Sequence, residues 1–61
     1  MEKGYPGNGD YPPTYITVSL TVRDKKSKER RTFPAYWSGF MWVGLGGFKV
    51  GNSKKEWWIR G

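Results

Sequence analysis

The chain has 61 residues, no Cys, no His, and a formal net charge of +6 from 11 Lys and Arg against 5 Asp and Glu. The absence of Cys and His excludes disulfides and thiolate metal sites and removes the commonest general base, so no cofactor or metal is expected. A chain this short buries only about 60% of its unfolded surface and needs additional stabilisation. Four Trp, four Tyr and three Phe can supply it, because each buried aromatic removes about 150–250 Å² from water.

The N-terminal segment differs in composition from the rest of the chain. Residues 1–14 hold three Gly and three Pro, and Pro12-Pro13 blocks a helix and favours extended backbone. We predict a flexible or loosely docked arm over residues 1–14 and a single small domain over residues 15–61. No segment has the length of a membrane span or the apolar stretch of a signal peptide, so we expect a cytoplasmic protein without membrane contact.

The clearest predicted element covers residues 15–23, where apolar and polar side chains alternate. Alternation with β-branched residues predicts a half-buried strand. Its inward face holds Ile16, Val18, Leu20 and Val22. Residues 24–30 are polar and predict a hairpin loop, and residues 31–37 predict a second strand. Pro34 has no N–H to donate, so it predicts a sheet edge or a bulge.

The chain then turns back on itself. Residues 38–39, Ser-Gly, predict a tight two-residue turn. In that register Phe40 lies opposite Trp37, and Trp42 lies opposite Ala35, so aromatic pairs stabilise the hairpin.

Two further turns divide the remaining residues into short strands. We predict strands over residues 40–45, 48–50 and 55–60, with turns at Gly46-Gly47 and at residues 51–53. The predicted fold class is all-β: a small antiparallel meander of four to five strands, curled into a half-barrel or an SH3-like sheet.

This sheet has two apolar faces. The main face combines the first strand's aliphatic residues with Phe33, Ala35, Trp37, Phe40 and Trp42. The second face carries Tyr36, Met41, Val43 and Leu45. A second apolar face requires a cover. The candidates are the last strand with Trp57 or Trp58, the N-terminal arm, or another copy of the chain in a homodimer.

The residue pattern argues against an enzyme. The five carboxylates are scattered and form no spaced pair on one strand, so a two-carboxylate acid/base site is not expected. Without His or Cys the common nucleophilic triads are impossible. Residues 44–47, Gly-Leu-Gly-Gly, lack the Lys-Ser/Thr end of a phosphate loop and predict a turn.

Binding is better supported. Residues 23–31 hold six basic and two acidic residues, which indicates either a loop that tracks a phosphate backbone or a solvated turn. A second basic group lies near the C-terminus, and Tyr15, Tyr36 and Trp58 fall off the main apolar face. Basic loops beside exposed aromatics are typical of nucleic-acid binding, single-stranded or duplex. The predicted contact residues are Arg23, Lys25, Lys26, Lys28, Arg30, Arg31, Tyr36, Lys54, Lys55, Trp58 and Arg60.

The order of features also resembles a protein group. An alternating strand (residues 15–23) is followed by a basic hairpin, an Ala-Tyr-Trp-x-Gly-x-x-Trp segment (residues 35–42) and a closing EWWIR strand (residues 56–60). This pattern resembles small uncharacterised accessory proteins of phages and prophages. The resemblance implies a phage-encoded protein in the host cytoplasm that binds and inhibits a host protein. The resemblance assigns no residue roles. Because Tyr, Trp and Met are enriched at protein interfaces, we expect the docking residues on an acidic host surface to be Tyr36, Met41, Val43 and Trp58.

Overall fold

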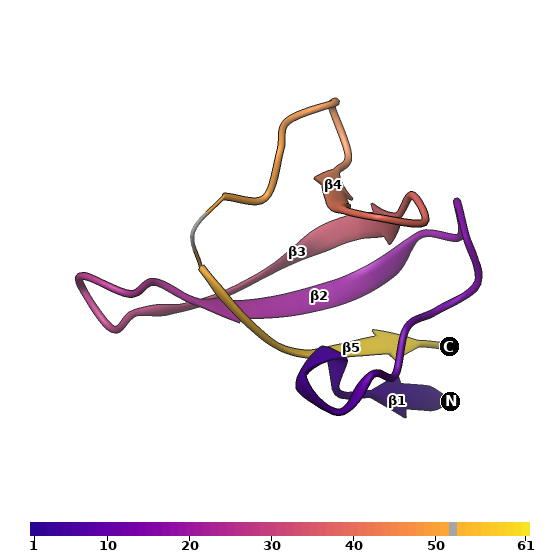
Figure 1. Ribbon diagram of the computed structural model, residues 1–61, viewed down its shortest axis with the longest axis horizontal. Coiled ribbons are helices and arrows are strands. Elements are labelled where there is room, and N and C mark those ends of the chain that lie inside the picture. Colours follow the sequence, from indigo (N-terminus) through magenta and orange to yellow (C-terminus); the bar gives the residue numbers. More distant parts are fainter. Residues whose placement is uncertain (52) are drawn as a thin grey trace.

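The computed structural model describes residues 1–51 and 53–61 and consists of one five-stranded antiparallel sheet. The elements are β1 (Glu2–Gly4), a short 3-10 helix η1 (Pro6–Asn8), β2 (Val18–Arg23), β3 (Arg30–Trp37), β4 (Trp42–Gly44) and β5 (Lys54–Arg60). The all-β fold class is confirmed. The sheet is open, with β1 and β4 at its two edges (Figure 1).

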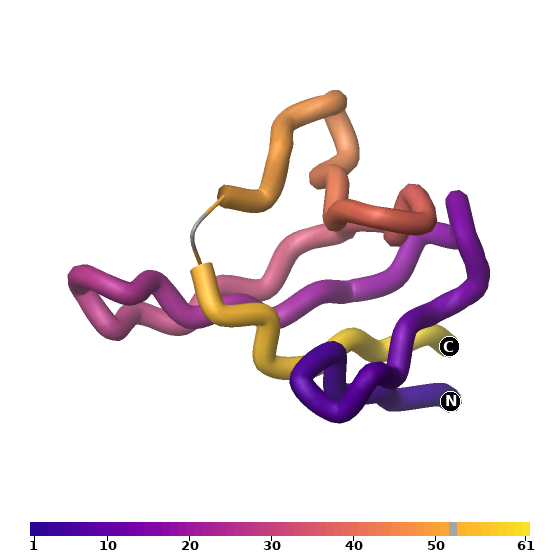
Figure 2. Tube along the Cα trace, in the orientation of Figure 1, coloured from indigo at the N-terminus to yellow at the C-terminus, as the bar shows by residue number. Residues whose placement is uncertain are grey.

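The strand order departs from a simple meander at β5. The strands β2, β3 and β4 are sequential neighbours, but β5 crosses back to pair with β2, and β1 adds outside β5. Consequently the two chain termini lie side by side, whereas the β2–β3 loop projects at the opposite end (Figure 1, Figure 2).

The core lies against one face of this sheet. As predicted, alternation in β2 places Val18, Leu20 and Val22 together in the core, although Thr21 between them is buried as well. The buried apolar residues are Val18, Leu20, Val22, Ala35, Trp42 and Trp58, with Phe33, Trp37 and Val50 packed against them. We call this the covered face and the other side of the sheet the open face.

Residues 1–14 belong to the fold and are not an arm outside it. The strand β1 pairs with β5, which was not predicted. The Tyr11 ring stacks on Trp37 with centroids 4.2 Å apart, and Trp58 Nε1 donates a hydrogen bond to the Asp10 carbonyl at 2.8 Å. Stacking and a satisfied indole N–H are what a buried aromatic cluster requires. The segment after η1 therefore covers part of the core (Figure 2).

The first long strand begins later than predicted. Ile16 N donates to the Pro13 carbonyl at 3.3 Å, and Tyr15 has a φ of 61°, in the left-handed region. A turn of this kind interrupts extended backbone. The strand β2 therefore begins at Val18, and Ile16 is 37% exposed instead of lying in the core.

The β3–β4 turn is longer than predicted. Ser38 N and Ser38 Oγ each donate to the Met41 carbonyl at 3.0 Å, which closes a four-residue turn. The register places Trp37 opposite Trp42. The predicted pairing of Trp37 with Phe40 is therefore wrong, and Phe40 is 85% exposed at the turn instead of buried.

Pro34 lies at a sheet edge, as predicted. On β3, the pairing with β4 covers Ala35–Trp37 and ends before Pro34, and the Pro34 carbonyl accepts a hydrogen bond from Leu45 N at 3.2 Å. In an antiparallel strand the N–H and C=O of one residue point to the same side. The missing N–H of Pro34 therefore faces the side where β4 has ended, and no ladder bond is lost.

The Gly46-Gly47 turn is also confirmed, since both residues have positive φ and Gly47 N donates to the Gly44 carbonyl at 3.0 Å. The predicted strand over residues 48–50 is reduced to a single bridge between Val43 and Lys49. The predicted turn at residues 51–53 includes Asn52, which lies outside the described residues.

Candidate functional site

Basic residues from distant parts of the chain meet at one end of the sheet. The register places Arg23 opposite Arg30 of β3 and opposite Lys54 of β5. Like charges directly opposite each other destabilise a sheet. Glu56 offsets this repulsion, because Arg30 Nε lies 2.6 Å and Arg23 Nε lies 3.8 Å from Glu56 Oε1.

The Glu56 carboxylate is held ionised by this arrangement. Its side chain is 15% exposed. The hydrogen bond from Arg30, followed by the charge of Arg23, outweighs partial desolvation and holds the pKa of Glu56 below its ordinary value of 4.5. Glu56 therefore restrains the two arginines and leaves Lys54 without a carboxylate partner in the described part of the chain.

Beside Arg23 and Lys54 is an open hollow of about 310 Å³, which we call the cation hollow. It is lined by Arg23, Asp24, Lys25, Lys28, Ser53 and Lys54. Of the predicted C-terminal basic group, Lys54 therefore joins the predicted basic loop in one site. Lys26 lies on the same loop and borders an adjoining hollow with Lys25.

The one carboxylate in the cation hollow, Asp24, is engaged by backbone. Asp24 Oδ1 accepts hydrogen bonds from Lys26 N at 2.7 Å and Ser27 N at 3.0 Å. These bonds, with that of Ser27 the largest contribution, lower the pKa of Asp24. Asp24 is thus a structural group of the β2–β3 loop, which it closes together with a backbone bond from Asp24 N to the Glu29 carbonyl.

Two of the predicted contact residues belong to the covered face. Lys55 and Arg31 both lie opposite Val22 in their registers. Lys55 Nζ donates to the Gly51 carbonyl at 2.7 Å, and burial, followed by the charge of Lys25, lowers the pKa of Lys55. Arg31 and Lys55 therefore add positive charge behind the cation hollow and do not line it.

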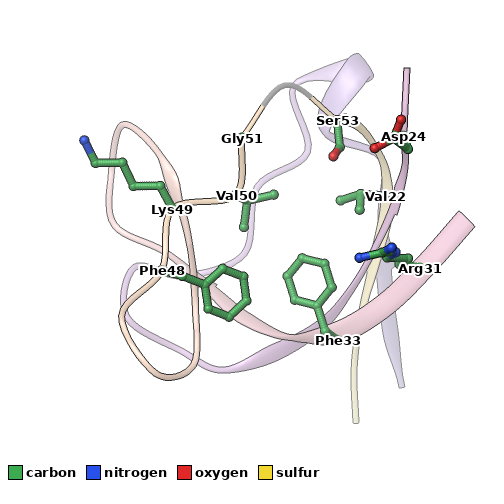
Figure 3. A pocket seen from close by; sticks show the side chains of 9 residues that line it. All are labelled: Val22, Asp24, Arg31, Phe33, Phe48, Lys49, Val50, Gly51 and Ser53. Carbon is green, nitrogen blue, oxygen red and sulfur yellow. The ribbon is translucent and has the colours of Figure 1, made fainter. Parts of the chain in front are cut away.

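A second depression lies on the covered face (Figure 3). The Phe33 and Phe48 rings lie 5.7 Å apart in it; Arg31 points toward it, and Lys49 points away (Figure 3). Its volume of about 150 Å³ is below the roughly 300–1,000 Å³ of typical small-molecule pockets. We therefore regard it as the edge of the core.

Two predicted residues lie away from the cation hollow. Arg60 Nη1 lies 3.3 Å from Glu2 Oε1 near the chain termini. Tyr36 lies near the opposite end of β3 from Arg30, about 20 Å along the strand, and its ring centroid is 5.6 Å from that of Tyr15. The structure does not bring these residues together with the basic loop.

Trp58 was predicted to be an exposed contact residue, and this prediction is wrong. It lies opposite Leu20, is 4% exposed and belongs to the core. Adjacent strand residues point to opposite faces, so its neighbour Trp57, opposite Thr21, lies on the open face. Either Trp suited the sequence pattern, and only the pairing of β5 with β2 determines which one is buried.

Trp57 lies between two cations. The Arg30 guanidinium carbon is 5.1 Å and Lys3 Nζ is 5.0 Å from its ring centroid, distances at which cation–π attraction operates. Thr21, beneath it, is 2% exposed and hydrogen-bonds the Thr32 hydroxyl at 2.8 Å. Trp57 and Lys3 were not among the predicted contact residues, because the pattern placed Trp58 off the main apolar face and Lys3 in the N-terminal arm.

Residues 1–51 and 53–61 show neither a metal site nor a membrane-spanning helix. No group of three or more Asp and Glu in them is placed to hold a metal ion. None of the helical structure described is long and apolar enough to cross a membrane. Comparisons with protein-family models, curated proteins and solved structures find no match.

Proposed function

We propose that this protein is a non-catalytic module that binds nucleic acid through the cation hollow and the adjacent open face. The observation that supports the proposal is the meeting of Arg23, Lys25 and Lys28 with Lys54, which comes from 26 positions or more farther along the chain. Converging cations favour a ligand with repeated negative charge, and a phosphate backbone is such a ligand.

The basic residues in and beside the hollow differ in whether a carboxylate pairs with them. Arg23 and Arg30 are restrained by Glu56. Among the described residues no carboxylate pairs with Lys25, Lys28 or Lys54 within 4.0 Å. Unpaired lysines can neutralise phosphates and release counterions without first breaking an ion pair, so they carry the salt-dependent part of binding.

The test is a double substitution that takes one cation from each chain segment, Lys28→Gln with Lys54→Gln. Fluorescence anisotropy of a labelled oligonucleotide, measured over a range of salt concentrations, gives the affinity and its salt slope. Because each phosphate neutralised contributes about 0.7 to the slope for a single strand, we expect the slope to fall by about 1.4. We also expect a lower affinity at low salt.

The matched control is Lys49→Gln with Arg60→Gln, which removes the same net charge away from the hollow. Lys49 points away from the depression in Figure 3, and Arg60 pairs with Glu2. We expect this control to change the slope much less. Equal effects of the two double variants would mean that net charge alone attracts the ligand, and no binding to single strands or duplexes at low salt would overturn the proposal.

A second candidate function is supported by the other end of the sheet. Phe40 is 85% and Tyr15 is 70% exposed, and their chain neighbours Gly39 and Thr14 are adjacent, since a Cβ at Gly39 would be 3.8 Å from Thr14 Cγ2. Exposed aromatics favour a protein partner, as expected of a phage-encoded inhibitor of a host protein. Recovery of one stoichiometric bacterial protein from nuclease-treated lysate, lost with Phe40→Ser, would support this alternative.

A further inference from the structure

Another hollow, of about 360 Å³, lies beside Trp57 at the N-terminal side of β5. Its lining residues are Tyr5, Gly7, Asn8, Lys54, Lys55, Glu56 and Trp57. The hollow has the size of typical small-molecule sites. It shares Lys54 with the cation hollow, so the two hollows both adjoin this one lysine.

Two aromatic rings line this hollow and share one cation. Lys3 Nζ lies 5.4 Å from the Tyr5 ring centroid and 5.0 Å from that of Trp57. In the described part of the chain Lys3 has no carboxylate partner. The Lys3 side chain is also exposed, so it can leave the two rings at low cost.

The second cation beside Trp57 is restrained. Arg30 approaches it from β3, whereas Lys3 approaches from β1, and these strands lie on opposite sides of β5. The Arg30 guanidinium is hydrogen-bonded to Glu56 at 2.6 Å. Arg30 is thereby held beside the indole by an ion pair, whereas Lys3 has no such restraint among the described residues and can be displaced.

We propose that the face of Trp57 over which Lys3 lies, together with the adjoining hollow, binds one unstacked base of a single-stranded nucleic acid, and that the base stacks on Trp57 when Lys3 moves away. Bases stack on aromatic side chains whatever their sequence, and Asn8 at the rim can contact the base edge through hydrogen bonds. The displaced Lys3 ammonium and Lys54 then contact the flanking phosphates. Paired bases inside a duplex cannot enter. This inference rests on the proposed function, which supplies the attraction for the phosphates.

The test compares an oligothymidylate of about ten nucleotides with a duplex of equal length, using the full chain and its Trp57→Leu variant. Because stacking contributes about 1–3 kcal/mol per base, the variant should lose about fivefold to 140-fold in single-strand affinity. Its affinity for the duplex should stay unchanged. The control Phe40→Leu alters a more exposed aromatic and should leave both affinities unchanged.

The outcomes separate the two proposals. Equal single-strand affinity of wild type and Trp57→Leu, or binding of the duplex alone, would overturn the base site and leave the binding function standing. No binding of either oligonucleotide would overturn both. Should Trp57→Leu fail to fold, photocrosslinking of wild type with a 5-bromouracil oligonucleotide decides the matter: adducts on Trp57 or Tyr5 support the site, and adducts only elsewhere overturn it.

Discussion

The two faces of the sheet are stabilised by different interactions. The covered face buries six apolar side chains beneath two irregular segments, residues 10–13 and residues 48–50. The open face relies on ion pairs, cation–π contacts and a threonine pair. Burial of apolar area is the dominant source of folding stability, whereas exposed ion pairs contribute little and are screened by salt. A small sheet can therefore be stabilised through one face and leave the other for a ligand.

The neighbours Trp57 and Trp58 show the difference between the two faces, because one lies on each face. Trp58 packs so closely on β1 that a Cβ at Gly4 would lie 2.5 Å from its ring. Trp57 contacts two cations on the opposite face. One residue type thus serves the core at one position and the surface at the next.

The largest effect is expected from Trp58→Ala. Removing a buried Trp costs about 3–5 kcal/mol, and a 61-residue domain has a total stability of only about 3–9 kcal/mol. We expect the variant to be largely unfolded, as judged by urea denaturation followed by circular dichroism. Trp57→Ala should cost clearly less, because its ring is partly exposed. Equal losses for both variants would contradict the division into two faces.

A smaller loss is expected from Tyr11→Ala, which removes the ring stacked on Trp37. Tyr11 is 46% exposed, so we expect a loss of about 1–2 kcal/mol in the free energy of unfolding. Chemical denaturation measures it. Tyr11→Phe keeps the ring and should remain near wild type. A Tyr11→Ala variant as stable as wild type would show that the N-terminal segment does not cover the core in solution.

The next effect concerns the open face and its pH dependence. Because the pKa of Glu56 is lowered on folding, its contribution to stability is present above pH 4.5 and is lost as the pH falls through the lower folded value. Glu56→Gln should therefore flatten the loss of stability on acidification below that pH. In the same variant Arg23 and Arg30 lose their carboxylate partner. They should then contact phosphates more readily and raise the oligonucleotide affinity by about threefold. Thermal melts at a series of pH values and anisotropy titrations check the two parts. An unchanged pH profile would mean that Glu56 is not paired in solution.

The smallest effect on stability is expected from Phe40→Ser. The ring is 85% exposed at a turn, and surface substitutions of this kind change stability by about 0.5 kcal/mol or less. Urea denaturation should give a midpoint indistinguishable from that of wild type. A large loss would place Phe40 in the core, as the sequence pattern predicted, and would contradict the four-residue turn.

The elements with a strong local pattern were predictable. The strand β2 and the polar loop after it follow from alternation and turn composition, and Pro34 at an edge follows from its missing N–H. The short strand β1 was not predictable, because three residues carry no periodic signal and its partner is β5 at the other end of the chain. The 38–41 turn was mispredicted because a Ser side chain, by bonding the Met41 carbonyl, closes a longer loop.

By itself, the sequence determined the fold class, the core residues of β2 and the presence of a basic loop, since each depends on neighbouring residues. Only the tertiary structure decided three other features: which Trp is buried, that residues 1–14 are part of the sheet and core cover, and that Lys54 joins the basic loop. All three depend on where β5 pairs. Strand pairing joins residues far apart in the chain, and a shift of one residue exchanges the two faces.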